Sequence, residues 1–147
     1  MKTIVVGYDG SDPAKRALER AGALAEKLGS KLVVTSVAEP VAVAEDPYIP
    51  GDAIGLAAPA IVPVPDRAEA SRELKEAREA LGARNLDVQY VATVGDAAQG
   101  IIEVADKHEA DLIVVGTRER GFVDRVLGGD VSETVSRRAH RDVLIVH

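Results

Sequence analysis

The segment from Gly116 to Glu133 has the composition of an anion-binding loop. A glycine ends an apolar run, an arginine-containing stretch follows, and a double glycine leads into the start of a predicted helix. Backbone N–H groups at a helix start attract anions, and three arginines would add positive charge: Arg118, Arg120 and Arg125. Because glycine-rich turns before helices are common, arginines on a merely solvated loop face are the competing interpretation.

Two further polar segments follow apolar runs earlier in the chain. Gly7 to Ser11 places Asp9 in a tight glycine-rich turn, and Val37-Ala38-Glu39-Pro40 follows the second run. In an open doubly wound sheet, ligands collect at the carboxyl ends of the strands. We therefore expect these segments and the Gly116 loop to converge on one site. For Asp9 and Ser11 two interpretations stay open: contact with a ligand, or only turn shaping and helix capping.

The elements that would position these segments alternate between short β-branched runs and longer helical ones. Apolar runs such as Leu112 to Val115 are typical of strands covered on both faces of a parallel sheet. Right-handed crossovers turn this alternation into an α/β fold, a three-layer doubly wound sheet with helices on both faces. The expected strands are 3–8, 31–38, 86–93, 111–115 and 142–146.

The ends of the four expected helices are marked by capping residues. Ser11 or Asp12 caps the first helix and Gly29 suits its end. The second helix stops at Gly82, and the fourth covers about 131–139. Three later helix starts carry acid–acid or acid–glutamine pairs typical of capping boxes: Asp66 with Glu69, Asp96 with Gln99, and Asp130 with Glu133.

Composition narrows the class of protein. The 147 residues are 46% hydrophobic but only 3% aromatic, which predicts one globular domain over 1–147 with an aliphatic core. Few aromatic rings and a net charge of −6 argue against nucleic-acid and membrane partners. The absence of cysteine removes disulfides and thiolate metal sites. No signal region precedes the first apolar run, so we expect a cytoplasmic protein.

One segment interrupts the alternation. Residues 39–65 hold six of the seven prolines and show no helical period, so we expect a loop. The favoured interpretation is a mobile flap beside the end of the second strand, with a short ordered piece as an option. A tolerated insertion is the alternative.

Several ordered motifs together resemble the universal stress protein family, in its small single-domain type. The motifs are Val5-Val6-Gly7-Tyr8-Asp9-Gly10-Ser11, Val94-Gly95-Asp96-Ala97-Ala98, Asp111-Leu112-Ile113-Val114-Val115-Gly116-Thr117-Arg118 and Asp142-Val143-Leu144-Ile145-Val146. The resemblance covers essentially the whole chain. It implies a Rossmann-like sheet of the adenine nucleotide alpha hydrolase type, with strand order 3-2-1-4-5. It also implies a homodimer and, in one branch of the family, an ATP site.

The resemblance also implies which residues would form an adenine-nucleotide site. Asp9 and Gly116 would face the ribose, Val37 and its neighbours the adenine, and the start of the last helix the phosphates. The expected cofactor is an adenine nucleotide, ATP or AMP-like, with or without Mg²⁺. The expected binding residues are Gly7, Tyr8, Asp9, Val37, Ala38, Gly116, Thr117, Arg118, Arg120, Gly129, Asp130, Val131 and Ser132.

Two positions depart from the motif of the ATP-binding branch, Gly-x2-Gly-x9-Gly followed by Ser or Thr. The second glycine falls on Glu119 and the Ser/Thr position on Asp130. Asp130 sits at a helix N-cap, where its carboxylate would accept hydrogen bonds from N–H groups that a phosphate needs. It would then act as a built-in anion and, with Glu119, repel a triphosphate. Three outcomes stay open: the arginines outweigh the acids, Mg²⁺ bridges Asp130 to phosphate, or the site prefers AMP or a cyclic nucleotide.

Catalysis is not expected. The chain has no Walker Gly-Lys-Ser/Thr and no Ser-Gly-Gly phosphate loop, and its three histidines form no constellation: His108, His140 and His147. A response-regulator receiver is rejected because no lysine follows the last strand. Slow ATP hydrolysis stays open, although no residue is placed as its base.

The last strand supports a different function, protein interaction. Residues 142–146 form an apolar edge strand with almost nothing after it. Antiparallel pairing with the same strand of a second copy would cover this edge and generate a two-fold homodimer. A nucleotide-free interaction module with a degenerate ATP motif is therefore the alternative to a nucleotide-binding protein.

Overall fold

The central sheet has five parallel strands. They are β1 (Thr3–Gly7), β2 (Lys31–Ala38), β5 (Val88–Val94), β6 (Leu112–Gly116) and β7 (Asp142–Val146), in the order β5-β2-β1-β6-β7. In chain order of these five strands this is 3-2-1-4-5, so the predicted topology is confirmed. The computed structural model describes residues 1–45, 60–117 and 130–147, with only the backbone of 41–45 and 60–65.

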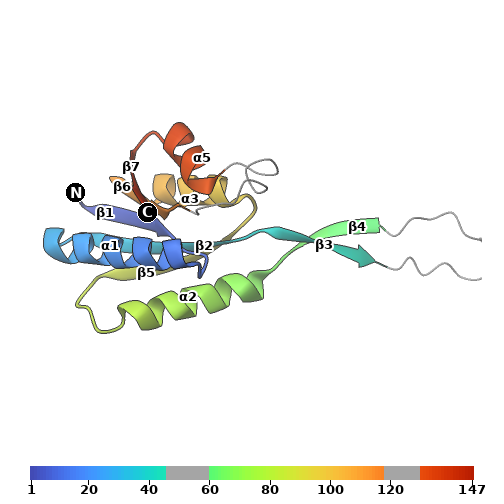
Figure 1. The fold of residues 1–147 in the computed structure, drawn as a ribbon, viewed down its shortest axis with the longest axis horizontal. Coiled ribbons are helices and arrows are strands. Elements are labelled where there is room, and N and C mark those ends of the chain that lie inside the picture. Colours follow the sequence, from blue (N-terminus) through green and yellow to red (C-terminus); the bar gives the residue numbers. More distant parts are fainter. Residues whose placement is uncertain (46–59, 118–129) are drawn as a thin grey trace, which may run out of the picture.

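Helices cover both faces of the sheet (Figure 1). α1 (Asp12–Leu28) and α2 (Arg67–Leu81) pack on one face, and α3 (Ala97–Lys107) and α5 (Val131–Arg138) on the other. Alternate strand residues serve the two cores, because successive side chains of a strand point to opposite faces. Val6 and Val34 pack toward α1 and α2, whereas Val5 and Val33 pack toward α3 and α5. This explains why the strands read as continuous apolar runs.

The helix ends follow local capping chemistry, as expected. Ser11 caps α1, and Asp66 and Asp96 cap α2 and α3 by accepting hydrogen bonds from Glu69 N and Gln99 N. Gly29 ends α1 in the left-handed conformation with φ 62°. Gly82 ends α2 with φ −57°, so this glycine terminates the helix without needing a left-handed backbone.

The expected loop over 39–65 is partly wrong. Its two ends form strands, β3 (Pro40–Glu45) and β4 (Ala60–Pro65), which pair antiparallel as an arm that extends beyond the sheet (Figure 1). Proline is disfavoured inside a sheet because it has no N–H group to donate. In β4, however, the prolines alternate with residues that keep an N–H group, so the intervening positions can form the ladder. The remainder of the predicted flap, 46–59, lies outside the described residues.

β7 is an edge strand. It pairs with β6 on one side, and among the described residues no strand pairs with its other edge. Its residues from Val143 to Val146 are only partly buried. The strand predicted to form a dimer contact is therefore placed where a second copy can reach it.

Candidate functional site

A cavity of about 240 Å³ lies at the carboxyl ends of β1, β2 and β6. This is the edge where ligands bind in open α/β sheets. Its walls come from the turn after β1, the end of β2, α2, the start of α3, the end of β6 and the start of α5. The lining residues are Gly7, Tyr8, Asp9, Ser11, Ala14, Thr35, Val37, Glu39, Glu69, Glu73, Ala97, Ile101, Val115, Gly116, Asp130 and Val131.

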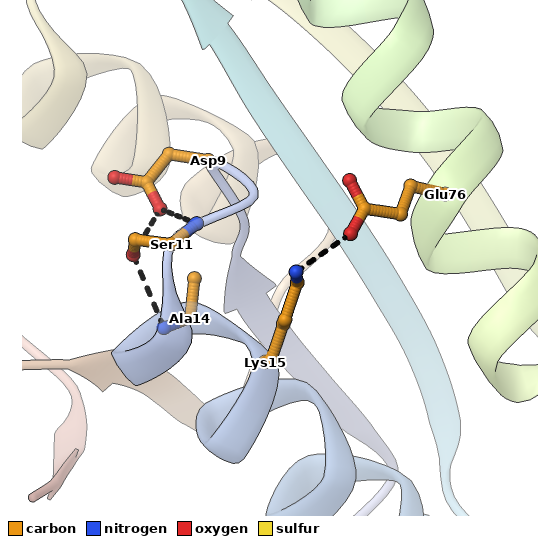
Figure 2. A network of polar contacts seen from close by, with 5 residues as sticks. All are labelled: Asp9, Ser11, Ala14, Lys15 and Glu76. Atoms are coloured by element: carbon orange, nitrogen blue, oxygen red, sulfur yellow. Dashed lines mark hydrogen bonds and ion pairs between the residues drawn. The ribbon is translucent and has the colours of Figure 1, made fainter.

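The turn after β1 places Asp9 in the cavity wall while holding its carboxylate in the helix cap (Figure 2). Asp9 Oδ1 accepts hydrogen bonds from Ser11 N at 3.0 Å and from Ser11 Oγ at 2.5 Å. Ser11 Oγ in turn accepts from Ala14 N at 3.3 Å. The turn-shaping and capping interpretation of Asp9 and Ser11 is thus confirmed, and it coexists with their position in the cavity.

The opposite side of the cavity is the start of α5. Asp130 caps this helix, and its Oδ1 accepts from Ser132 N at 3.1 Å. Its Oδ2 lies 3.5 Å from Thr117 Oγ1, which donates to it. Asp130 therefore places a carboxylate at the helix start and engages one of the backbone N–H groups that would otherwise attract an anion.

Sequence reasoning placed Glu39 at this site but missed the two carboxylates that α2 adds to the cavity wall. Glu39 follows β2, while Glu69 and Glu73 come from α2. Ser36 Oγ donates a hydrogen bond to Glu73 Oε2. Burial raises the pKa of Glu73, and the nearby carboxylates of Glu69 and Asp9 act in the same direction. The available signal was the spacing of glutamates at 69, 73 and 76, which puts them on one helix face.

An ion pair joins the two helices beside this wall (Figure 2). Lys15 Nζ of α1 lies 3.0 Å from Glu76 Oε1 of α2, and this contact lowers the pKa of Glu76. Both side chains are about half exposed, so the pair contributes little to stability. Tyr8 lies nearby with only 3% of its surface exposed. Burial, with the Glu76 carboxylate close by, raises the pKa of Tyr8 well above its ordinary value.

A buried hydroxyl group in the cavity wall, Thr35 Oγ1, has no hydrogen-bond partner among the described residues. Thr35 is completely buried in β2, yet it lines the cavity. Because buried polar groups are nearly always hydrogen-bonded in native proteins, this wall is suited to a polar ligand.

The structure brings together seven of the expected binding residues as cavity lining: Gly7, Tyr8, Asp9, Val37, Gly116, Asp130 and Val131. Thr117 and Ser132 are attached to this set through their hydrogen bonds to Asp130. Ala38 is buried but is not part of the lining. Arg118, Arg120 and Gly129 lie outside the described residues, as do Glu119 and Arg125.

No group of three or more His, Cys, Asp or Glu side chains among the described residues is arranged to hold a metal ion. No helix in the described ranges combines the length and apolar character needed to cross a bilayer.

Comparison with known proteins gives a consistent result. A universal stress protein of Mycobacterium tuberculosis, Rv1636, is 34% identical over 153 residues, covering 99% of this chain and 96% of its own length. A universal stress protein of Thermus aquaticus is 36% identical over 146 residues, covering 99% and 98%. Among solved structures, a universal stress protein in complex with cAMP matches with a TM-score of 0.72 and 30% identity, covering 99% and 97%.

The family description that matches is the universal stress protein family, and the match extends over residues 1–147. The fold, the relatives and this match agree, so the chain belongs to the universal stress protein family.

Proposed function

We propose that this protein binds an adenine nucleotide of low charge in the cavity at the carboxyl ends of β1, β2 and β6. The observation that carries the proposal is the cavity itself, which runs from the start of α5 to the end of β2. The related universal stress protein solved with cAMP, at 30% identity over nearly the whole chain, supports the ligand class.

The charge of the wall favours a ligand with few phosphates. Five carboxylates line the cavity: Asp9, Glu39, Glu69, Glu73 and Asp130. The described lining contains no lysine or arginine. A triphosphate would face Coulomb repulsion from these groups, whereas cAMP or AMP carries much less charge. ATP held by the arginines of 118–125 or by Mg²⁺ is the competing ligand, and thermal unfolding with each nucleotide distinguishes it from cAMP and AMP.

The protein acts by binding in this proposal, not by catalysis, in a cytoplasmic stress response. The described cavity offers acceptors and buried hydroxyls but no histidine or lysine. Nucleotide occupancy would be read out by a partner or by the arm formed by β3 and β4, which leaves the domain next to the cavity residue Glu39.

Thermal unfolding with each of cAMP, AMP, ADP and ATP, with and without Mg²⁺, tests the proposal. A ligand at 100 times its dissociation constant adds about 2.7 kcal/mol, which shifts Tm by several degrees. We expect the largest shift with cAMP or AMP. A larger shift with ATP would mean that the arginines or Mg²⁺ overcome the acidic wall. Absence of any shift would contradict nucleotide binding.

A second candidate function is a nucleotide-free homodimeric interaction module, and the open edge of β7 favours it. Dimerisation through β7 is compatible with either function, because the cavity lies at the strand ends and not at this edge. Sedimentation at micromolar concentration should give a dimer. A monomer under these conditions would refute pairing through β7.

A further inference from the structure

The cavity has two chemically different ends. At one end, beside Gly116, lies the start of α5, whose backbone N–H groups attract the anionic part of a ligand even though the Asp130 carboxylate accepts from one of them. At the other end, the lining includes Val37 of β2, whose side chain packs toward α3, and, from the opposite face of the sheet, Glu69 and Glu73 of α2. β2 and β6 flank β1 in the sheet, so the two ends are about 10 Å apart, two strand spacings. A nucleotide with its phosphate at α5 therefore places its base between Val37 and α2.

Among the carboxylates at the base end, Glu73 is the one held in place. Its side chain is half-buried, and it accepts a hydrogen bond from Ser36 Oγ, whose residue is completely buried. Glu39 and Glu69, at the same end, are exposed. Glu73 also lies against the turn after β1, since a Cβ on Gly10 would be 3.9 Å from its Cγ. Fixed acceptors discriminate between ligands better than solvated ones, because they do not reorient to suit each partner.

An independent observation indicates that the cavity is suited to a polar ligand. Thr35 lines the same cavity and is completely buried, and its hydroxyl has no hydrogen-bond partner in the described part of the chain. An unpaired buried hydroxyl costs free energy until a ligand or a water molecule pairs with it. The acidic residues are therefore part of a cavity whose polar groups are incomplete without an occupant.

We propose that Glu73 determines base specificity: its carboxylate accepts a hydrogen bond from the 6-amino group of adenine and so rejects 6-oxo purines. The inference rests on the proposed function, because it names the residue that reads the base in that site. An ionised carboxylate only accepts hydrogen bonds, so a 6-amino donor pairs with it, whereas a 6-oxo acceptor is left opposite another acceptor. A site built this way discriminates by about tenfold or more.

Calorimetric titration of the wild-type protein and two variants with cAMP and with cyclic IMP tests this assignment. The two ligands share ribose and phosphate and differ in the group at position 6. The measurements are made at pH 8, because burial raises the pKa of Glu73 and the test requires its ionised carboxylate. We expect wild type to bind cAMP at least about tenfold more tightly than cyclic IMP.

Glu73→Gln is the decisive variant. The amide keeps an oxygen that can accept from Ser36 or from the 6-amino group, and it adds an N–H donor for a 6-oxo group. The ratio of the two affinities should therefore fall to near one or invert. Glu79→Gln, the same charge change on the exposed part of α2, should leave the ratio at its wild-type value. Unfolding curves establish that each variant is folded.

The outcomes separate this inference from the function on which it rests. If wild type prefers cAMP and only Glu73→Gln removes the preference, the assignment holds. If wild type binds both ligands equally, or if Glu73→Gln keeps the preference, the assignment is overturned while nucleotide binding stands. If wild type binds neither ligand, the proposed function fails and the assignment fails with it.

Discussion

Gly116 at the end of β6 lies directly against Pro13 in the first turn of α1, so closely that a Cβ on Gly116 would overlap the carbonyl group of Pro13. This contact brings two walls of the cavity together, because Gly116 and Ala14 both line it. The glycine is therefore required by packing, whatever role it has toward a ligand.

Gly116→Ala should destabilise the protein by about 1–3 kcal/mol, the usual cost of overpacking. The clash is with backbone, which cannot move aside without displacing α1. Gly7→Ala is the matched comparison, since its Cβ would lie 2.7 Å from Ile101 Cδ1, the flexible end of a side chain. Urea unfolding should show the larger loss for Gly116→Ala. Equal losses would contradict the close approach of α1 to β6.

Ser11→Ala should lower stability by about 1 kcal/mol, because it removes the N-cap of α1. It also removes one of the two donors that hold the Asp9 carboxylate in the cavity wall. We therefore expect weaker cAMP binding as well. Ser11→Thr keeps the hydroxyl and should restore both properties, as measured by urea unfolding and by titration. Loss of stability with Ser11→Thr equal to that with Ser11→Ala would argue against capping as the cause.

Glu73→Gln should be more stable than wild type at neutral pH. The pKa of Glu73 is raised in the folded state by burial and by Glu69 and Asp9, so folded protein holds this proton more tightly than unfolded chain. Its favourable contribution is complete below the unfolded pKa and is lost as pH rises through the folded pKa. The advantage of the variant should shrink as pH falls toward the ordinary value of 4.5.

Unfolding midpoints recorded between pH 4 and pH 8 measure this dependence. Glu79→Gln changes the net charge equally on the exposed part of the same helix and corrects for the general effect of charge. A Glu73→Gln advantage that is constant with pH, or greatest in acid, would show that burial does not govern this carboxyl.

Asp130→Asn should raise the affinity for ATP by about tenfold and the affinity for cAMP by much less. Asparagine retains the N-cap of α5 but removes a negative charge from the cavity wall, and a triphosphate gains more from that removal than a single phosphate does. Asp130→Ser should behave similarly, since serine also caps helices. Titration with both ligands measures the change. An unchanged ATP affinity in both variants would mean that Asp130 is not an anion in the phosphate position.

Much of the fold could be predicted because its signals are local. The buried runs around Val5 and Val114, the caps Ser11 and Asp96 and the glycine at 29 each report the conformation of their own few residues. The arm formed by β3 and β4 could not be predicted in this way. Its composition resembles a loop, and only the pairing of one segment with the other makes it a pair of strands.

The features of the candidate site likewise fall into two groups, those that the sequence predicts and those that only the folded structure reveals. The sequence by itself determined that the turn after β1, the end of β2 and the start of α5 meet at one edge, since parallel strands with right-handed crossovers leave no other arrangement. Only the tertiary structure decided that α2 presents Glu73 to Ser36, 37 residues earlier in the chain. It also decided that Thr35 is buried with no hydrogen-bond partner in the described ranges and that Gly116 meets Pro13. These relationships depend on the distances between packed elements, which no local pattern of residues encodes.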